Sequence, residues 1–142
     1  IQDLRKENLK YCLDSSSTNI PKDTELYIVD SYGKTESFYK ISKIVFLGGS
    51  FIKHGGQNPI EPAKLGCKTV SGPHIWNFKE IYKFLNDKKV TIKAKNSNQL
   101  AKIVKLSINK KSYSNSIKKK LKMIGDKILK NIEKKLNPLI NR

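Results

Sequence analysis

Residues 44–67, IVFLGGSFIKHGGQNPIEPAKLGC, combine two glycine pairs with one isolated carboxylate, and both features suit ligand binding. Gly48 and Gly49 directly follow an apolar run, where glycine lets the backbone approach a ligand closely and permits a positive φ. Gly55 and Gly56 precede a short helical pattern, whose free N–H groups and partial positive charge suit a phosphate or a carboxylate. A plain tight turn and an ordinary capped helix explain the same pattern without a ligand.

The start of that short helix holds the carboxylate. Asn58 is a suitable N-cap and Pro59 a suitable first helical residue, so Glu61 falls in the first turn. A negative charge there favours the helix dipole, which is a structural role. A carboxylate also has two acceptor oxygens, the usual means of holding the vicinal hydroxyls of a ribose. An anion pocket and a ribose acceptor one turn apart predict a nucleotide site.

Two other loops hold further candidates. In SYGKTE, Tyr32 is suited to border a base and Gly33 offers backbone groups to base edges, although a helix start capped by Ser31 explains this segment equally well. The two histidines of the chain, His54 and His74, have no evident Asp or Ser partner in the sequence. We therefore assign neither of them the role of a catalytic base.

Apolar runs alternate with helical patterns along the chain, which predicts an α/β fold. The expected strands are residues 25–31, 43–49, 67–72 and 89–94, and the expected helices are residues 1–13, 33–42, 59–66, 77–86 (capped by Asn77) and 96–109. This order predicts a Rossmann-like parallel sheet with right-handed crossovers and helices on both faces. Ligands of such sheets bind beyond the carboxyl ends of the strands, and the first glycine pair falls at such an end.

Residues 113–142 form a second predicted part, a basic amphipathic helix that follows a sheet domain over residues 1–112. Apolar residues recur every three or four positions, at Ile117, Leu121, Ile124, Ile128, Ile132 and Leu136. One interpretation buries this stripe on a neighbouring domain or on the sheet. The other directs the lysine-rich face toward anionic lipid.

The net charge of +17 has two possible sources. A functional basic surface would bind nucleic acid, an anionic membrane or acidic substrates. A compositional bias toward lysine would spread the same charge over solvated faces, and the scarcity of arginine favours this second source. The excess is nevertheless uneven, because residues 101–142 carry a net charge of +11.

Other features limit the possible classes of protein. Cys12 and Cys67 lie in no CxxC motif, so we expect neither a zinc site nor a disulfide framework, and a reduced cytosolic setting fits best. No apolar run is long enough for a membrane span, and no signal peptide is evident. The chain begins with an isoleucine inside a helical pattern, so we expect it to be the end of a longer protein.

The motifs GGS, HGGxNPxEP and GPHxxNF occur in order within residues 48–78. Together with DTELYIVDSYGKTESFYKIS, they resemble the C-terminal half of the 3-deoxy-D-manno-octulosonic acid (Kdo) transferases of Gram-negative bacteria, which have the GT-B glycosyltransferase fold. The resemblance covers about residues 23–85 and is weaker beyond them. It implies transfer of Kdo from CMP-Kdo to a lipid A precursor at the cytoplasmic face of the inner membrane, as part of lipopolysaccharide biosynthesis.

The resemblance also implies roles for individual residues. Tyr32, Gly33 and Lys34 would border the CMP, and Asn58, Pro59, Ile60 and Glu61 would hold its ribose and phosphate. Gly48, Gly49, Ser50, Gly55 and Gly56 would complete the nucleotide-sugar site. Lys34 stands where many relatives have an acid or another residue, so we expect only its backbone to contact the donor.

The acceptor domain and the catalytic base of this family lie in an N-terminal half that has no counterpart here. The resemblance therefore implies that this fragment binds donor without transferring it, and no catalytic residue is assigned. The reaction would be an inverting displacement with CMP as the leaving group, for which we expect no metal and no cofactor. The expected partners are CMP-Kdo, the lipid A precursor and a membrane surface, but not nucleic acid.

Two alternatives stay open from the sequence. One is another GT-B enzyme that uses a UDP-sugar, since such enzymes also place a glycine loop and a ribose-binding glutamate in this region. The other is a non-enzymatic basic module for membranes or nucleic acid, which would rest on the charged tail.

Overall fold

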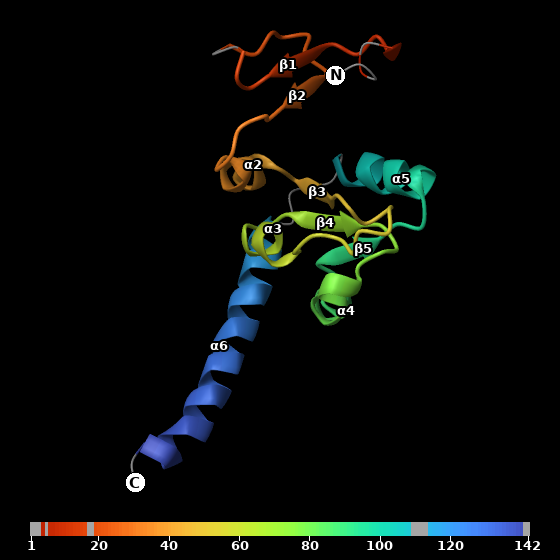
Figure 1. Cartoon of the computed structure of the whole chain (residues 1–142). Coiled ribbons are helices and arrows are strands. Elements are labelled where there is room, and N and C mark those ends of the chain that lie inside the picture. The colour runs from red at the N-terminus through yellow and green to blue at the C-terminus, as the bar shows by residue number, and fades with distance from the viewer. Residues whose placement is uncertain (1–3, 5, 17–18, 109–113, 141–142) are drawn as a thin grey trace. The chain divides into compact units, whose positions relative to one another are not determined.

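A computed structural model of the chain describes residues 4, 6–16, 19–108 and 114–140 (Figure 1). Within residues 114–140 it leaves out the side chains of residues 114, 116, 124, 127, 128, 135 and 138–140. The chain divides into two compact units, residues 1–37 and residues 38–142. The division predicted between residues 112 and 113 stays a prediction. No helix in the described part of the chain is long and apolar enough to cross a membrane.

The first unit is built on two short parallel strands, β1 (Tyr11–Leu13) and β2 (Leu26–Ile28). Strand β2 lies within the predicted run 25–31. The helix predicted over residues 1–13 is wrong for its last three residues, which form β1; residues 1–3 and 5 lie outside the described part. The reason is non-local, because Cys12 pairs with Tyr27 across the two strands.

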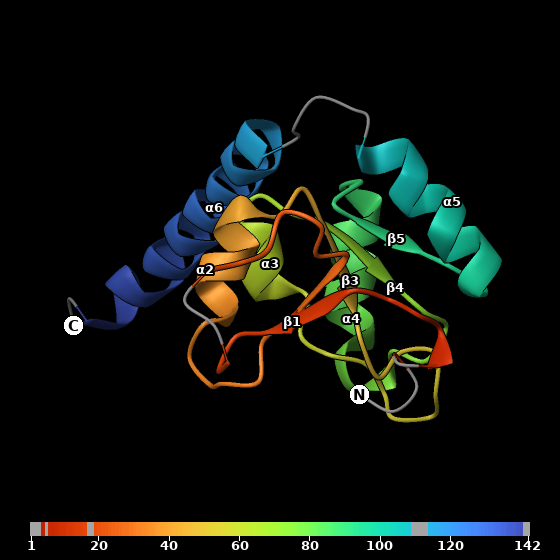
Figure 2. The ribbon, with the colours of Figure 1, turned by 90° about the horizontal axis from the view of Figure 1, so that it is seen from above.

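The second unit is a three-stranded parallel sheet of order β3-β4-β5. Its strands are β3 (Ile44–Leu47), β4 (Lys68–Ser71) and β5 (Thr91–Lys93), each within a predicted run. The helices are α2 (Thr35–Ile41, across the division of the units), α3 (Ile60–Lys64), the 3₁₀ turn η1 (Trp76–Phe78), α4 (Lys79–Asp87), α5 (Ser97–Ile108) and α6 (Ser114–Ile140). Helices α5 and α4 lie on opposite faces of the sheet (Figures 1 and 2). The predicted α/β fold with parallel strands is confirmed. The prediction of one sheet for all four runs is wrong for residues 25–31, because β2 pairs with β1 in a separate two-stranded sheet.

The core of the second unit surrounds the central strand. Val70 of β4 is fully buried, as expected for a strand with neighbours on both edges and a helix layer on each face. Ala63, Leu85, Val90 and Ile117 form a buried cluster that joins α3, α4 and the start of α6. The first turns of α6 therefore belong to the folded unit, as one of the two interpretations of its stripe required.

Candidate functional site

The loops after β3 and β4 form one hydrogen-bonded structure at the carboxyl edge of the sheet. The amide of Gly56 donates to the carbonyl of Gly49 (3.1 Å), so the two glycine pairs lie together. The amide of His74 donates to the carbonyl of Ser50 (2.9 Å), and the amide of Asn77 donates to the carbonyl of Gly55 (3.3 Å). Because β3 and β4 are parallel neighbours, both loops leave the sheet at the same edge.

Glycine is needed at specific positions of these loops. Gly49, Gly55 and Gly56 have φ values of 65°, 97° and 79°, in the left-handed region that favours glycine. A Cβ atom at Gly55 would also lie 2.3 Å from the side-chain nitrogen of Asn77. Gly48 is different, since its φ is not positive and a Cβ atom would meet nothing within 4 Å. At Gly48, therefore, neither strain nor crowding within the described residues requires glycine.

Two polar residues of the loops act inside the protein. The hydroxyl of Ser50 is completely buried; it donates to the carbonyl of Leu47 (2.6 Å) and accepts the amide of Gly72 (2.8 Å). The predicted cap Asn77 is wrong, because α4 begins at Lys79 and the Asn77 side chain donates to the carbonyl of His54 (3.2 Å) instead. Both side chains hold the loops in place through these hydrogen bonds. The hydroxyl of Ser50 is therefore not available to bind a ligand.

The start of α3 offers fewer free amides than its sequence suggests. The helix begins at Ile60 with Pro59 as N-cap, one residue later than predicted, and the side-chain oxygen of Asn58 accepts the amide of Ile60 (3.0 Å). Pro59 and Pro62 have no N–H group, and the amide of Ala63 donates to the carbonyl of Pro59 (3.3 Å). In the described residues this leaves the amide of Glu61 as the free first-turn donor.

The Glu61 carboxylate and the Asn58 side chain are both exposed at the start of α3. The residue before them is fixed from behind, because the hydroxyl of Tyr82 in α4 donates to the carbonyl of Gln57 (2.9 Å). Burial raises the pKa of the Tyr82 phenol to about 12, so that it stays protonated and keeps donating. The fold therefore presents two adjacent polar side chains on a rigid support.

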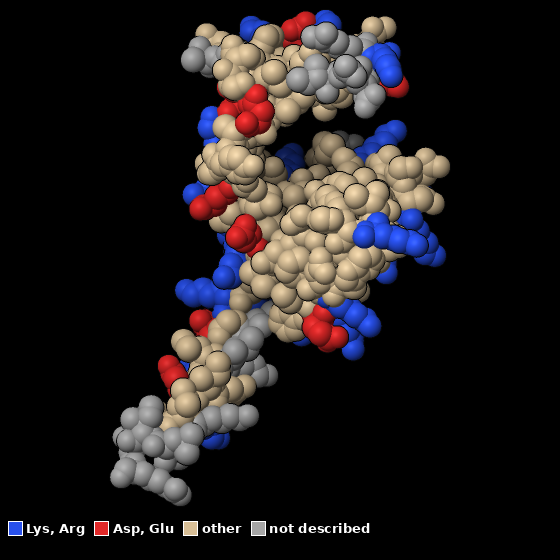
Figure 3. Space-filling model, in the orientation of Figure 1, with Lys and Arg blue, Asp and Glu red and all other residues tan. Residues whose placement is uncertain are grey.

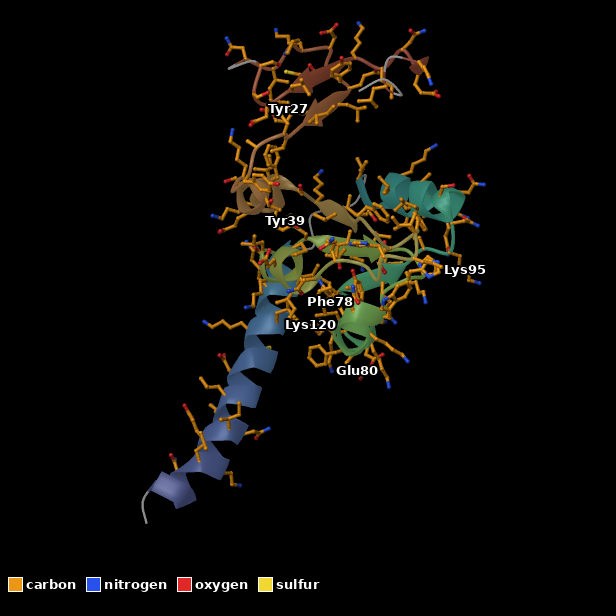
Figure 4. The ribbon with its side chains drawn as sticks, viewed as in Figure 1. Tyr27, Tyr39, Phe78, Glu80, Lys95 and Lys120 are labelled. Carbon is orange, nitrogen blue, oxygen red and sulfur yellow. The ribbon has the colours of Figure 1, made fainter. Side chains whose placement is uncertain are left out.

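Lys95, a cationic residue at the same end of the strands, was not among the site residues predicted from the sequence. Lys95 (Figure 4) is exposed and lies two positions after the end of β5, and its amide donates to the side chain of Gln99 (2.6 Å). Its position immediately after the last predicted strand was the available signal. The histidines play structural parts: the ring of His54 lies under Gly49, and the ring of His74 makes an edge contact with Trp76 at 5.6 Å.

In the first unit, Asp14 holds the segment with Tyr32 and Gly33 through hydrogen bonds to the residues on either side. Asp14 was not selected from the sequence. The Asp14 carboxylate accepts hydrogen bonds from Lys34 (2.5 Å), Tyr27 (2.6 Å) and Ser31 (2.8 Å). The ammonium group of Lys34 is therefore engaged, in agreement with the expectation that only its backbone is available. Tyr32 is fully exposed and Gly33 has a φ of 84°, so the turn displays the phenol ring.

The Asp14 cluster predicts an acid-sensitive first unit. The Lys34 ammonium, followed by the hydroxyls of Tyr27 and Ser31, lowers the pKa of Asp14 from 3.8 to about 2. The folded state thus favours the ionised carboxyl, and this stabilisation is complete above pH 3.8 and is lost as the pH falls toward 2. We expect hydrogen exchange in residues 11–34 to accelerate over this interval.

Asp14→Asn should remove most of that acceleration. Asp23 and Asp30, whose pKa values are lowered by bonds to Lys10 and Ser15, would account for the remainder. An equally steep acid dependence in the variant would show that Asp14 does not hold this unit together.

The second unit can bind a ligand through backbone groups, one carboxylate and one amide side chain. No group of three or more His, Cys, Asp or Glu residues suited to a metal ion occurs in the part of the chain that the structure describes.

Comparison with curated proteins matches the chain to 3-deoxy-D-manno-octulosonic acid transferases. The relative from Haemophilus influenzae is 38% identical over 82 residues, which are 58% of this chain and 19% of that protein. The relative from Rickettsia typhi is 32% identical over 109 residues, which are 77% of this chain and 22% of that protein. The chain thus spans about a fifth of the length of these relatives. A scan against protein-family models gives no match.

Among solved structures, the chain matches the C-terminal CMP-Kdo binding domain of WaaA from Acinetobacter baumannii. The TM-score is 0.75 at 27% identity, and the match covers 82% of this chain and 61% of that one. The chain is therefore similar, in sequence and in fold, to the C-terminal part of Kdo transferases. The resemblance inferred from the motifs is confirmed, and so is the GT-B fold. The roles of the individual site residues stay predictions.

Proposed function

We propose that this chain is the donor-binding part of a Kdo transferase, a glycosyltransferase that transfers Kdo from CMP-Kdo. The observation that carries the proposal is the match in fold to a CMP-Kdo binding domain at 27% identity over 82% of the chain. The carboxyl edge of the β3-β4-β5 sheet supports it, because that is where a nucleotide is expected in a sheet of this kind.

The proposed site residues contact different parts of the donor. The Glu61 carboxylate accepts hydrogen bonds from the ribose hydroxyls, and the free amide of Glu61 with the Asn58 side chain faces the phosphate. Gly49, Gly55 and Gly56 allow the backbone of the loops to approach the ligand closely. The contacts of Tyr32, Gly33 and Lys34 with the CMP, which the resemblance implies, stay predictions for the first unit by itself.

Transfer requires an acceptor hydroxyl to attack the anomeric carbon while the bond from that carbon to the phosphate oxygen breaks. CMP leaves with the bonding electron pair, and the hydroxyl loses its proton to a base. Hydrogen-bond donors at the phosphate stabilise the charge that develops on the leaving group. We assign the base to an N-terminal acceptor domain, as the resemblance to Kdo transferases implies.

The acceptor in this proposal is a lipid A precursor, and the enzyme acts in lipopolysaccharide biosynthesis at the cytoplasmic face of the inner membrane. The names of the relatives, which are Kdo transferases, support the reaction. The basic surface of the chain supports a location beside anionic lipid, because a net charge of +17 attracts such a surface.

A transfer assay tests the proposal. The intact protein, supplied with CMP-Kdo and a lipid A precursor, should release CMP and form a Kdo-modified lipid detectable by mass spectrometry. Residues 1–142 alone should bind CMP but release none from CMP-Kdo. Failure of the intact protein to use CMP-Kdo, combined with turnover of a UDP-sugar, would reject it in favour of another GT-B enzyme.

A further inference from the structure

A pocket lies between α4 and the outer strands of the second sheet, β4 and β5. It has a volume of about 270 Å³, several times the share of about 30 Å³ that one molecule has in liquid water. The end of β4, the loop after it, one side of α4 and the whole of β5 line this pocket. Among the described residues of the lining, none belongs to the proposed donor site. The pocket is therefore a separate candidate for ligand binding.

The sheet presents hydroxyl groups to this pocket. Ser71 and Thr91 line it and are only 1% and 4% exposed. Side chains alternate along a strand, so Thr69 lies on the same face of β4 as Ser71, and it is the register partner of Thr91. Within the described residues, none of these three hydroxyls has a hydrogen-bond partner. One face of two neighbouring strands thus carries three unpaired hydroxyls.

Unpaired hydroxyls are unfavourable in such a layer. The face of a parallel sheet that a helix covers is normally apolar, and a buried hydroxyl without a partner lowers stability. Valine has nearly the shape of threonine and would suit positions 69 and 91 better if packing alone mattered. Because Ser71 and Thr91 adjoin a pocket, a polar occupant there would supply the missing hydrogen bonds. Water and a small anion are both polar, and the charge around the pocket distinguishes between them.

Lysines from two elements surround this pocket. Lys79 and Lys83 lie one turn apart on α4, Lys93 ends β5, and all three are exposed. Within the described residues, their ammonium groups have no ion-pair partner and the lining contains no acid, since Glu80 of α4 lines a different groove, beside α3 and α6. Figure 3 shows basic side chains exposed around α4. Like charges around one pocket repel one another, and an anion between them relieves this repulsion.

We propose that this pocket binds a phosphate group, either as inorganic phosphate or as a phosphate monoester. The phosphate oxygens accept hydrogen bonds from the hydroxyls of Ser71 and Thr91 and from the side-chain amide of Asn86, and the lysines neutralise the charge. The site goes beyond donor binding. Tyr82 lies between the two sites, because it lines the pocket while its hydroxyl donates to the carbonyl of Gln57 ahead of α3 (2.9 Å).

Calorimetric titration of the intact protein with inorganic phosphate and with glycerol 3-phosphate, at constant ionic strength, tests the proposal. We expect one saturable site for both, and the tighter of the two identifies the natural source of the phosphate group. Lys79→Gln with Lys83→Gln should weaken binding about tenfold or more. Lys102→Gln with Lys105→Gln is the matched control, because it removes the same charge from α5 on the opposite face of the sheet and should leave binding unchanged.

Variants of the two hydroxyl residues separate binding from folding. Ser71→Ala and Thr91→Val should each weaken phosphate binding several-fold. Without phosphate, their thermal stability should equal or exceed that of the parent, because an unpaired buried hydroxyl is removed. A purely structural role would give the reverse, lower stability with unchanged affinity. CMP affinity should be the same in every variant, and phosphate should not displace CMP, which keeps this test apart from the donor site.

Three outcomes would overturn the inference. Absence of saturable binding by either phosphate compound would mean that water alone fills the pocket. Equal weakening by the Lys79 and Lys83 pair and by the Lys102 and Lys105 pair would assign the binding to general attraction by the net charge of +17. Displacement of CMP by phosphate would place the phosphate in the donor site.

Discussion

Glu61→Ala is expected to weaken CMP binding by about 1 to 3 kcal/mol, because charged hydrogen bonds to the ribose hydroxyls are lost. The carboxylate is exposed at the start of α3, so the substitution leaves the core untouched. Loss of a first-turn negative charge should lower the free energy of unfolding by only about 0.3 to 1 kcal/mol. Calorimetric titration of the intact protein with CMP measures the first effect, and thermal unfolding measures the second.

Glu80→Ala is the matched control for Glu61→Ala. Glu80 is also an exposed acid in the first turn of a helix, α4, so the charge and the helix position are the same. It should not change the affinity for CMP. Glu61→Gln, which keeps one acceptor oxygen but not the charge, should fall between the parent and the alanine variant. Unchanged CMP affinity in Glu61→Ala would remove Glu61 from the site.

Gly72→Ala is expected to lower the free energy of unfolding by about 3 kcal/mol or more, at the upper end of the usual cost of overpacking. An added Cβ would lie 2.3 Å from the carbonyl oxygen of Ser50 and 2.7 Å from the ring of Phe51. The carbonyl cannot move aside cheaply, because it is main chain and accepts the amide of His74. The two loops that carry the donor site would then separate, and CMP binding should fall together with stability.

Gly48→Ala provides the contrast within the same loops. A Cβ atom at Gly48 meets nothing within 4 Å and its φ is not positive, so the free energy of unfolding should change by less than about 1 kcal/mol. Chemical denaturation of both variants measures the difference. Equal stability of Gly72→Ala and Gly48→Ala would mean that the close contact between the two loops is not needed for folding.

The positions of β2, β3, β4 and β5 along the chain were predictable from the sequence because they depend on local signals. Short apolar runs such as IVFL and TVS have the length and composition of buried strands, and glycine ends several of the elements. The glycine positions also carried correct information, since Gly49, Gly55 and Gly56 all have the positive φ that glycine permits. A few neighbouring residues are enough to determine these strands and glycine turns.

What the sequence could not show depends on partners distant along the chain. Residues 11–13 were expected in a helix and instead pair with β2, because the ladder contact outweighs a fortuitous helical spacing of leucines. Asn77 is a good capping type, yet its side chain bonds to a carbonyl that lies 23 positions earlier. Asp14 and Ser50 likewise take their roles from loops that only the fold brings to them.

The candidate site was predictable in part for the same reason. Asn58 and Glu61 were selected from a local helix start, and both are exposed there. The number of free amides was overestimated, since two prolines and the Asn58 side chain leave one first-turn donor. Lys95 was missed although it follows the last predicted strand, because no motif next to it in the sequence points to a ligand.

The central claim is that the glycine loops and Glu61 form a site for a cytidine nucleotide. Calorimetric titration of the intact protein with CMP and with UMP tests it most directly. We predict that CMP binds more tightly than UMP, and that Glu61→Ala weakens CMP binding while Glu80→Ala does not. Tighter binding of UMP would contradict the assignment and would point to an enzyme that uses a UDP-sugar.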